Sequence, residues 1–154
     1  YLIVVRPGMN GVIFSADQPW AVVAGGAGLG SNGPVPELFL YVPEGCERFR
    51  VACTATSPNE GARVVLTAPD GSTALTLDGE FDRPETHEVP VPAGARGGVW
   101  SFVWARPQSV PATLDDVVIA LDGQLAPALW PQRTWAATYG PDVWTRHRRA
   151  MGWE

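Results

Sequence analysis

The 154-residue sequence predicts an all-β fold, namely an antiparallel β-sandwich of jelly-roll-like type with a short C-terminal helix. Three observations predict this fold. The chain contains ten short apolar or alternating runs, turn residues separate these runs, and no helical pattern appears between them. The 17 Gly and 15 Pro residues recur along most of the chain, which excludes a long helical bundle.

The expected strands follow one another at short intervals. They cover residues 2–5, 12–15, 20–24, 38–42, 48–55, 63–68, 74–77, 86–91, 99–105 and 116–121. Asp70 and Gly71 between two β-rich runs are a strong hairpin signal. Ten strands favour a jelly-roll-like double sheet over the seven strands of an immunoglobulin constant-type domain. The Gly-rich segment 24–34 lacks the strand–helix context of a nucleotide-binding loop, and we expect a flexible surface loop there.

The end of the chain changes character. Pro141 is suited to the first position of a helix, which we expect over residues 142–151. Asp142 at its start and three arginines near its end complement the helix dipole. The chain therefore divides into a β-sandwich module of residues 1–138 and a C-terminal helical tail or linker of residues 139–154.

Composition excludes several classes of protein. The formal net charge is −5, whereas sequence-independent nucleic-acid binding needs a basic surface, so we expect no nucleic-acid partner. No apolar run reaches the roughly 18 residues of a membrane helix, so we expect no membrane partner. The hydrophobic fraction of 45% is sufficient for a folded core. Because the sequence starts at Tyr1 rather than Met, we expect it to be part of a longer protein.

Catalytic arrangements are weakly represented. The two histidines are His87 and His147, and no Gly-x-Ser-x-Gly segment occurs. Asp115 and Asp116 are adjacent, so on a strand they would point to opposite faces and could not act as a paired acid and base. We therefore expect a non-enzyme, with a small hydrolase or lyase as the third and weakest hypothesis.

One alternating set of carboxylates has the spacing of a cation site. Asp78, Glu80 and Asp82 would direct oxygen atoms to one side of an extended segment, as Ca²⁺ requires. A solvated Asp-Gly turn explains the same residues. Structural calcium is the one cofactor that the sequence raises.

A stripe of aromatic residues occupies one face of the strand expected over 99–105. Trp100, Phe102 and Trp104 share this face because side chains alternate along a strand. The stripe is either the core face of the sandwich or a partly exposed platform on which sugar rings stack. The pattern alone leaves both interpretations open.

Other tryptophans lie in loop-like sequence. Trp20 follows Pro19, and Trp130 and Trp135 flank Arg133. Aromatic rings for stacking, together with forked donors for hydroxyl groups, are what a sugar-binding surface needs. The alternative interpretation is a plug of tryptophans that closes one end of the sandwich.

Three stretches carry a family resemblance. Residues 37–51 contain an aromatic strand and a Val-Pro-Glu-Gly turn, residues 63–71 end in Pro-Asp-Gly, and residues 89–102 run from Val-Pro-Ala-Gly to Trp-Ser-Phe. Over about residues 37–122 the chain resembles bacterial β-sandwich accessory modules joined to polysaccharide-degrading enzymes. The resemblance implies a jelly-roll fold and a non-catalytic, carbohydrate-binding-type role in an extracellular or periplasmic protein. Secreted pre-peptidase-type β-sandwich domains share the turn pattern, which keeps a protease-associated role open.

The leading hypothesis is a carbohydrate-binding module that binds a polysaccharide or oligosaccharide and targets a catalytic domain of the same polypeptide. Its expected ligand-binding residues are Trp20, Trp130, Trp135 and Arg133, followed by Trp100 and Trp104. The alternative is a structural accessory domain that packs against a catalytic domain, glycosidase or protease, and has no ligand of its own. The exposure of the tryptophans distinguishes the two hypotheses.

Overall fold

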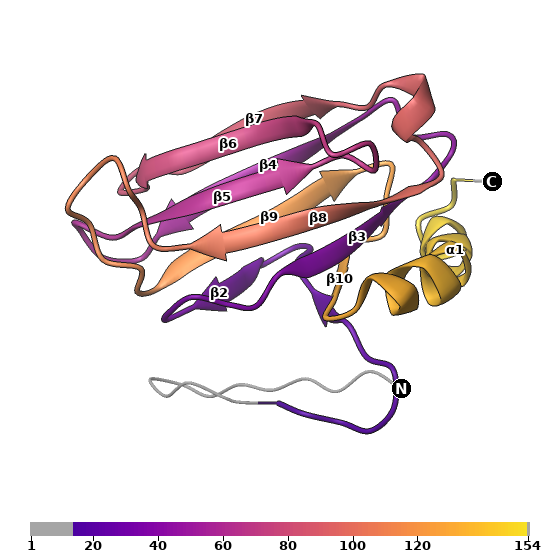
Figure 1. Ribbon diagram of the computed structural model, residues 1–154, viewed down its shortest axis with the longest axis horizontal. Coiled ribbons are helices and arrows are strands. Elements are labelled where there is room, and N and C mark those ends of the chain that lie inside the picture. Colours follow the sequence, from indigo (N-terminus) through magenta and orange to yellow (C-terminus); the bar gives the residue numbers. More distant parts are fainter. Residues whose placement is uncertain (1–13, 154) are drawn as a thin grey trace.

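A computed structural model describes residues 14–153, which form two antiparallel sheets packed face to face and one helix (Figure 1). The larger sheet has the strand order β1-β10-β3-β8-β5-β6, and the smaller sheet has the order β2-β9-β4-β7. The elements are β1 (Val22–Val23), β2 (Leu29–Ser31), β3 (Leu38–Val42), β4 (Arg48–Ala55), β5 (Gly61–Thr67), β6 (Thr73–Glu80), β7 (Glu85–Pro90), a 3-10 turn η1 (Ala93–Ala95), β8 (Gly98–Ala105), β9 (Val117–Gly123), β10 (Ala128–Trp130) and α1 (Arg133–Ala150). The predicted all-β sandwich with a C-terminal helix is confirmed.

Side-chain alternation determines which face of each strand is buried. In β4 the side chains of Phe49, Val51 and Cys53 point into the sandwich, and Arg48 and Arg50 point to solvent. The outward arginines form ion pairs with carboxylates of the neighbouring strands β7 and β9. The outer face of the smaller sheet is therefore polar, while its inner face belongs to the core.

The β5–β6 hairpin forms where the sequence predicts it. Gly71 adopts a φ of 86°, which suits glycine, and the Asp70 carboxylate accepts hydrogen bonds from the backbone N–H and the hydroxyl of Ser72. These hydrogen bonds lower the pKa of Asp70. The turn fixes the register of β5 and β6, which flank it.

The main core lies between the sheets and includes the aromatic stripe of β8. Trp100, Phe102 and Trp104 are buried, and Phe49 of the opposite sheet meets Trp100 edge to face at 5.7 Å between ring centroids. The core interpretation of the stripe is thus confirmed, and the platform interpretation is wrong. The two cysteines, Cys46 and Cys53, are free and buried.

A second, smaller core lies on the outer face of the larger sheet, where α1 covers β3 and β10 (Figure 1). Trp130 of β10 and Phe39 of β3 meet Ala136 of the helix there. Gly140 allows the close approach, because a Cβ atom at this position would lie 2.4 Å from the Cβ atom of Tyr41. This second core sets the position of α1 over the sheet.

Several predicted boundaries differ from the structure. The helix begins at Arg133 rather than at residue 142, and it contains Pro141 in its interior. The segment predicted as a flexible loop contains β2, which pairs with β9, and the loop-like sequence before Pro131 contains β10. The predicted strand 2–5 lies outside the described residues, and residues 14 and 15 of the predicted strand 12–15 are not in a strand.

Candidate functional site

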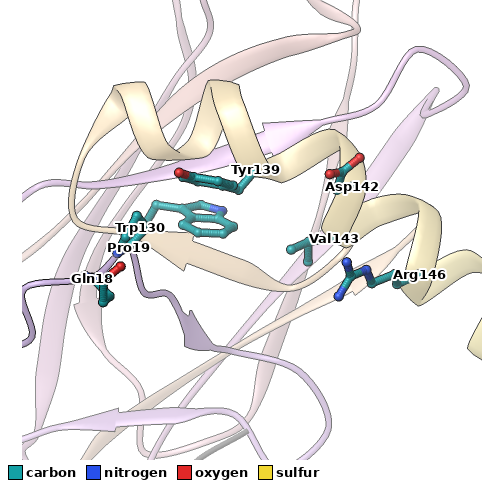
Figure 2. Close-up of a pocket in the computed structure, with 7 residues that line it drawn as sticks. All are labelled: Gln18, Pro19, Trp130, Tyr139, Asp142, Val143 and Arg146. Carbon is teal, nitrogen blue, oxygen red and sulfur yellow. The ribbon is translucent and has the colours of Figure 1, made fainter. Parts of the chain in front are cut away.

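A cavity of about 400 Å³ opens beside α1, where the chain before β1 passes the end of β10 (Figure 2). Its lining residues are Gln18, Pro19, Trp130, Tyr139, Asp142, Val143 and Arg146. Figure 2 shows Gln18 and Pro19 at one end of this cavity and Val143, Asp142 and Arg146 at the other. We call it the Tyr139 cavity.

An aromatic pair forms one wall of the Tyr139 cavity. The rings of Trp130 and Tyr139 stack at 6.2 Å between centroids with an interplanar angle of 25°. Trp130 is 5% exposed, whereas Tyr139 is 40% exposed. The buried indole therefore supports the phenol ring, and Tyr139 is the member of the pair that can offer its surface to a ligand.

Three polar side chains surround the same space. Gln18 supplies an amide, and Asp142 and Arg146 supply a carboxylate and a guanidinium from one helix face, because residues four apart lie above one another. Within residues 14–153 these three side chains form no hydrogen bond or ion pair with one another or with other groups. They are thus available as donors and acceptors for the hydroxyl groups of a bound molecule.

The residues predicted to bind a ligand are distributed between several roles. Trp100 and Trp104 are 0% and 1% exposed in the main core, so neither can stack against a ligand, and their assignment as binding residues is wrong. Trp130 lines the Tyr139 cavity but is buried. Trp20 and Trp135 are half-buried. Trp20 follows Pro19, which lines the cavity, and Trp135 packs into the second core.

Arg133 fastens the start of α1 to the sheet. Its guanidinium donates a hydrogen bond to the carbonyl oxygen of Val99 at 2.9 Å and lies 5.0 Å from the ring centroid of Phe39. Arg133 therefore has a structural contact and does not line the Tyr139 cavity, and its predicted role as a ligand donor stays a prediction. Arg146, one turn from the other end of the helix, provides the guanidinium of the cavity.

Asp78, Glu80 and Asp82 do not form the calcium site that their spacing suggests. The Asp78 carboxylate accepts hydrogen bonds from the backbone N–H groups of Gln108 and Ser109 and from Arg63, and these donors lower the pKa of Asp78. The Asp82 carboxylate accepts a hydrogen bond of 3.0 Å from the backbone N–H of Asn59. Across residues 14–153 no group of three or more His, Cys, Asp or Glu side chains is placed to hold a metal ion.

Sequence reasoning missed most of the cavity. Gln18, Tyr139, Asp142, Val143 and Arg146 line it, and none of them is among the ligand-binding residues expected from the sequence. The signal that could have found four of them is helical spacing, since positions 139, 142, 143 and 146 share one face of a helix that begins before residue 139. The expected start at residue 142 concealed this face.

No protein-family model matches the chain, and no curated protein is detectably similar to it. In the part of the chain that the structure describes, α1 is the one α-helix, and it is not apolar enough to cross a membrane.

Proposed function

We propose that this chain is a non-catalytic carbohydrate-binding module that holds a polysaccharide in the Tyr139 cavity and targets an attached glycoside-active enzyme. The observation that carries the proposal is the convergence of an exposed aromatic ring with an amide, a carboxylate and a guanidinium around one cavity. The volume of about 400 Å³ lies in the usual range of small-ligand sites.

The chemistry of these groups fits a sugar ring. The C–H groups on one side of a pyranose can pack against the phenol ring of Tyr139, which is held in place by Trp130. The hydroxyl groups at the ring edge can donate to Asp142 and accept from Arg146, while Gln18 can do both. Binding of this kind keeps a tethered enzyme near its substrate and raises its effective concentration without new chemistry.

A structural accessory domain is the second candidate, and the burial of the tryptophans favours it. Trp100, Trp104 and Trp130, three of the seven tryptophans, are buried in the two cores and are unavailable for stacking. Trp135, Trp144 and Trp153, with partly exposed rings, belong to α1 or its C-terminal end, so they could also face a neighbouring domain. This candidate predicts no affinity for any glycan.

The test is affinity gel electrophoresis in gels that contain single polysaccharides, neutral and acidic. The native chain should be retarded in at least one gel. Tyr139→Ala should weaken binding by about tenfold because it removes the exposed ring, whereas Tyr139→Phe keeps the ring and should retain most of the affinity. Circular dichroism verifies that both variants are folded. Native protein that migrates unretarded through every gel would reject the binding function and favour the structural role.

A further inference from the structure

The Tyr139 cavity is one part of a longer groove along α1. A second cavity of about 330 Å³ is lined by Val23, Gly25, Gly26, Ala126, Pro127, Ala128, Val143 and His147. Val143 lines both cavities, so they adjoin along the side of α1 that faces β1. From Tyr139 to His147 the helix rises about 12 Å, at 1.5 Å per residue. We call the two cavities together the α1–β1 groove.

The α1–β1 groove borders the basic part of an acidic protein. Helix α1 contains four arginines and one acidic residue, so its formal charge is 4 − 1 = +3. The rest of the chain contains 11 − 4 = 7 basic and 16 − 1 = 15 acidic residues, so its formal charge is 7 − 15 = −8. A ligand with many negative charges is repelled by the sandwich and attracted to the helix.

Arg146 differs from four arginines of the sandwich in its partners. Arg48, Arg50, Arg63 and Arg96 each form an ion pair with a carboxylate of the protein. Arg146, in contrast, lines the groove, and its guanidinium forms no ion pair with another of residues 14–153. A guanidinium with free N–H groups matches a carboxylate in a bidentate, charge-assisted pair.

The other groups of the groove distinguish a sugar polymer from other polyanions. Asp142 needs donors such as hydroxyl groups, which sugars provide at every ring and which a polyglutamate side chain lacks when ionised. Tyr139 and the apolar wall formed by Pro127, Ala126 and Val23 offer surface to the C–H faces of successive rings. Asp142 accepts hydrogen bonds from hydroxyl groups, Arg146 donates to carboxylates, and the apolar wall covers C–H faces. Together these groups match a carboxylated sugar chain.

We infer that the ligand of this module is an acidic, carboxylate-bearing polysaccharide that lies along the α1–β1 groove with a carboxylate on Arg146. This inference rests on the proposed function and specifies its ligand. It commits to one chemical class, because a neutral glycan would leave the Arg146 guanidinium without a carboxylate partner.

The experiment compares polygalacturonate with the same polymer after reduction of its carboxyl groups, by titration calorimetry of the full chain. Polygalacturonate should bind at least about tenfold more tightly than the reduced polymer, and its affinity should fall as salt is raised. Arg146→Gln should weaken polygalacturonate binding by about tenfold. Arg106→Gln is the matched control, since Arg106 is exposed and lies outside both cavities, and it should leave the affinity unchanged.

The outcomes separate the inference from the function on which it rests. Equal affinity for the native and reduced polymers would overturn the acidic-ligand inference and leave the carbohydrate-binding function intact. Absence of binding to these and all neutral polysaccharides would reject both. Equal binding of polyglutamate or of vesicles rich in phosphatidylserine would show a general anion surface and overturn the inference, as would equal losses in Arg146→Gln and Arg106→Gln.

Discussion

Trp100 and Trp104 occupy equivalent positions on the inward face of β8, and both are almost completely buried. Their indole nitrogens differ in their surroundings. The Nε1–H group of Trp100 donates a hydrogen bond to the carbonyl oxygen of Ala95 at 3.0 Å. The Nε1–H group of Trp104 has no partner among residues 14–153. One indole therefore fixes the loop before β8, while the other contributes through packing alone.

The pair predicts unequal costs for the same substitution. Trp100→Phe removes a buried hydrogen bond and leaves the Ala95 carbonyl without its partner, while Trp104→Phe removes a donor that has none. We expect Trp100→Phe to lower the free energy of unfolding by about 1–3 kcal/mol more than Trp104→Phe does. Urea unfolding followed by circular dichroism measures both variants. Because each loses the same atoms, equal costs would contradict this assignment and indicate a partner for the Trp104 nitrogen.

Sequence alternation predicted correctly that Trp100, Phe102 and Trp104 share a face, but it could not determine whether that face is covered. Coverage depends on the opposite sheet, where Phe49 meets Trp100. The same limit applies to Trp130, whose burial comes from a helix that follows it in the chain. Residue-level prediction therefore identified which side chains belong together, and the packing of distant elements decided their exposure.

At the level of elements, turn chemistry made the long strands predictable. The expected segments 38–42 and 48–55 coincide with β3 and β4, because Pro and Gly residues end them on both sides of a clear alternation. β2 and β10 contain three residues each, too few for alternation to appear. Their formation depends on pairing with β9 and β3.

The helix shows how one strong local signal can mislead. Pro141 fits the first position of a helix, yet it lies inside α1, where it cannot donate the usual backbone hydrogen bond. The hydroxyl of Thr145 donates to the Pro141 carbonyl oxygen at 2.9 Å. Helix residues before Pro141 are stabilised by tertiary contacts, since Trp135 and Ala136 pack into the second core. The sequence alone contains no measure of that docking.

Gly140 should resist the substitution that usually stabilises helices. Gly→Ala in a helix interior typically adds about 0.5–1 kcal/mol, but a Cβ atom here would lie 2.4 Å from the Cβ atom of Tyr41. We expect Gly140→Ala to displace α1 and to lower the free energy of unfolding by about 1–3 kcal/mol, as overpacking does. Thermal unfolding measures the change. Thr138→Ala, at an exposed position of the same helix, is the control and should be neutral or slightly stabilising. A stabilised Gly140→Ala variant would disprove the close approach.

At the scale of the whole molecule, composition averages over an uneven distribution of charge. The net charge of −5 argued against a nucleic-acid partner, but it combines a basic helix with an acidic sandwich. All 11 basic residues are arginine, and four of them lie in α1. The helix also lies outside the main core, which consists of residues from both sheets and their loops. The molecule therefore separates a stable framework from the element that holds the cavity.

This separation predicts the behaviour of a chain that ends at Gln132. The main core contains no residue of α1, so the shortened chain should keep its β-sheet signal in far-ultraviolet circular dichroism. Trp130 and Phe39 lose their cover, so tryptophan fluorescence should shift to the red, binding of a hydrophobic dye should rise and thermal stability should fall. The polysaccharide binding proposed for the Tyr139 cavity should disappear, because Tyr139, Asp142 and Arg146 are removed. An unfolded product would show that α1 is required for the sandwich itself, and retained binding in a folded product would place the glycan site on the sheets instead of the helix.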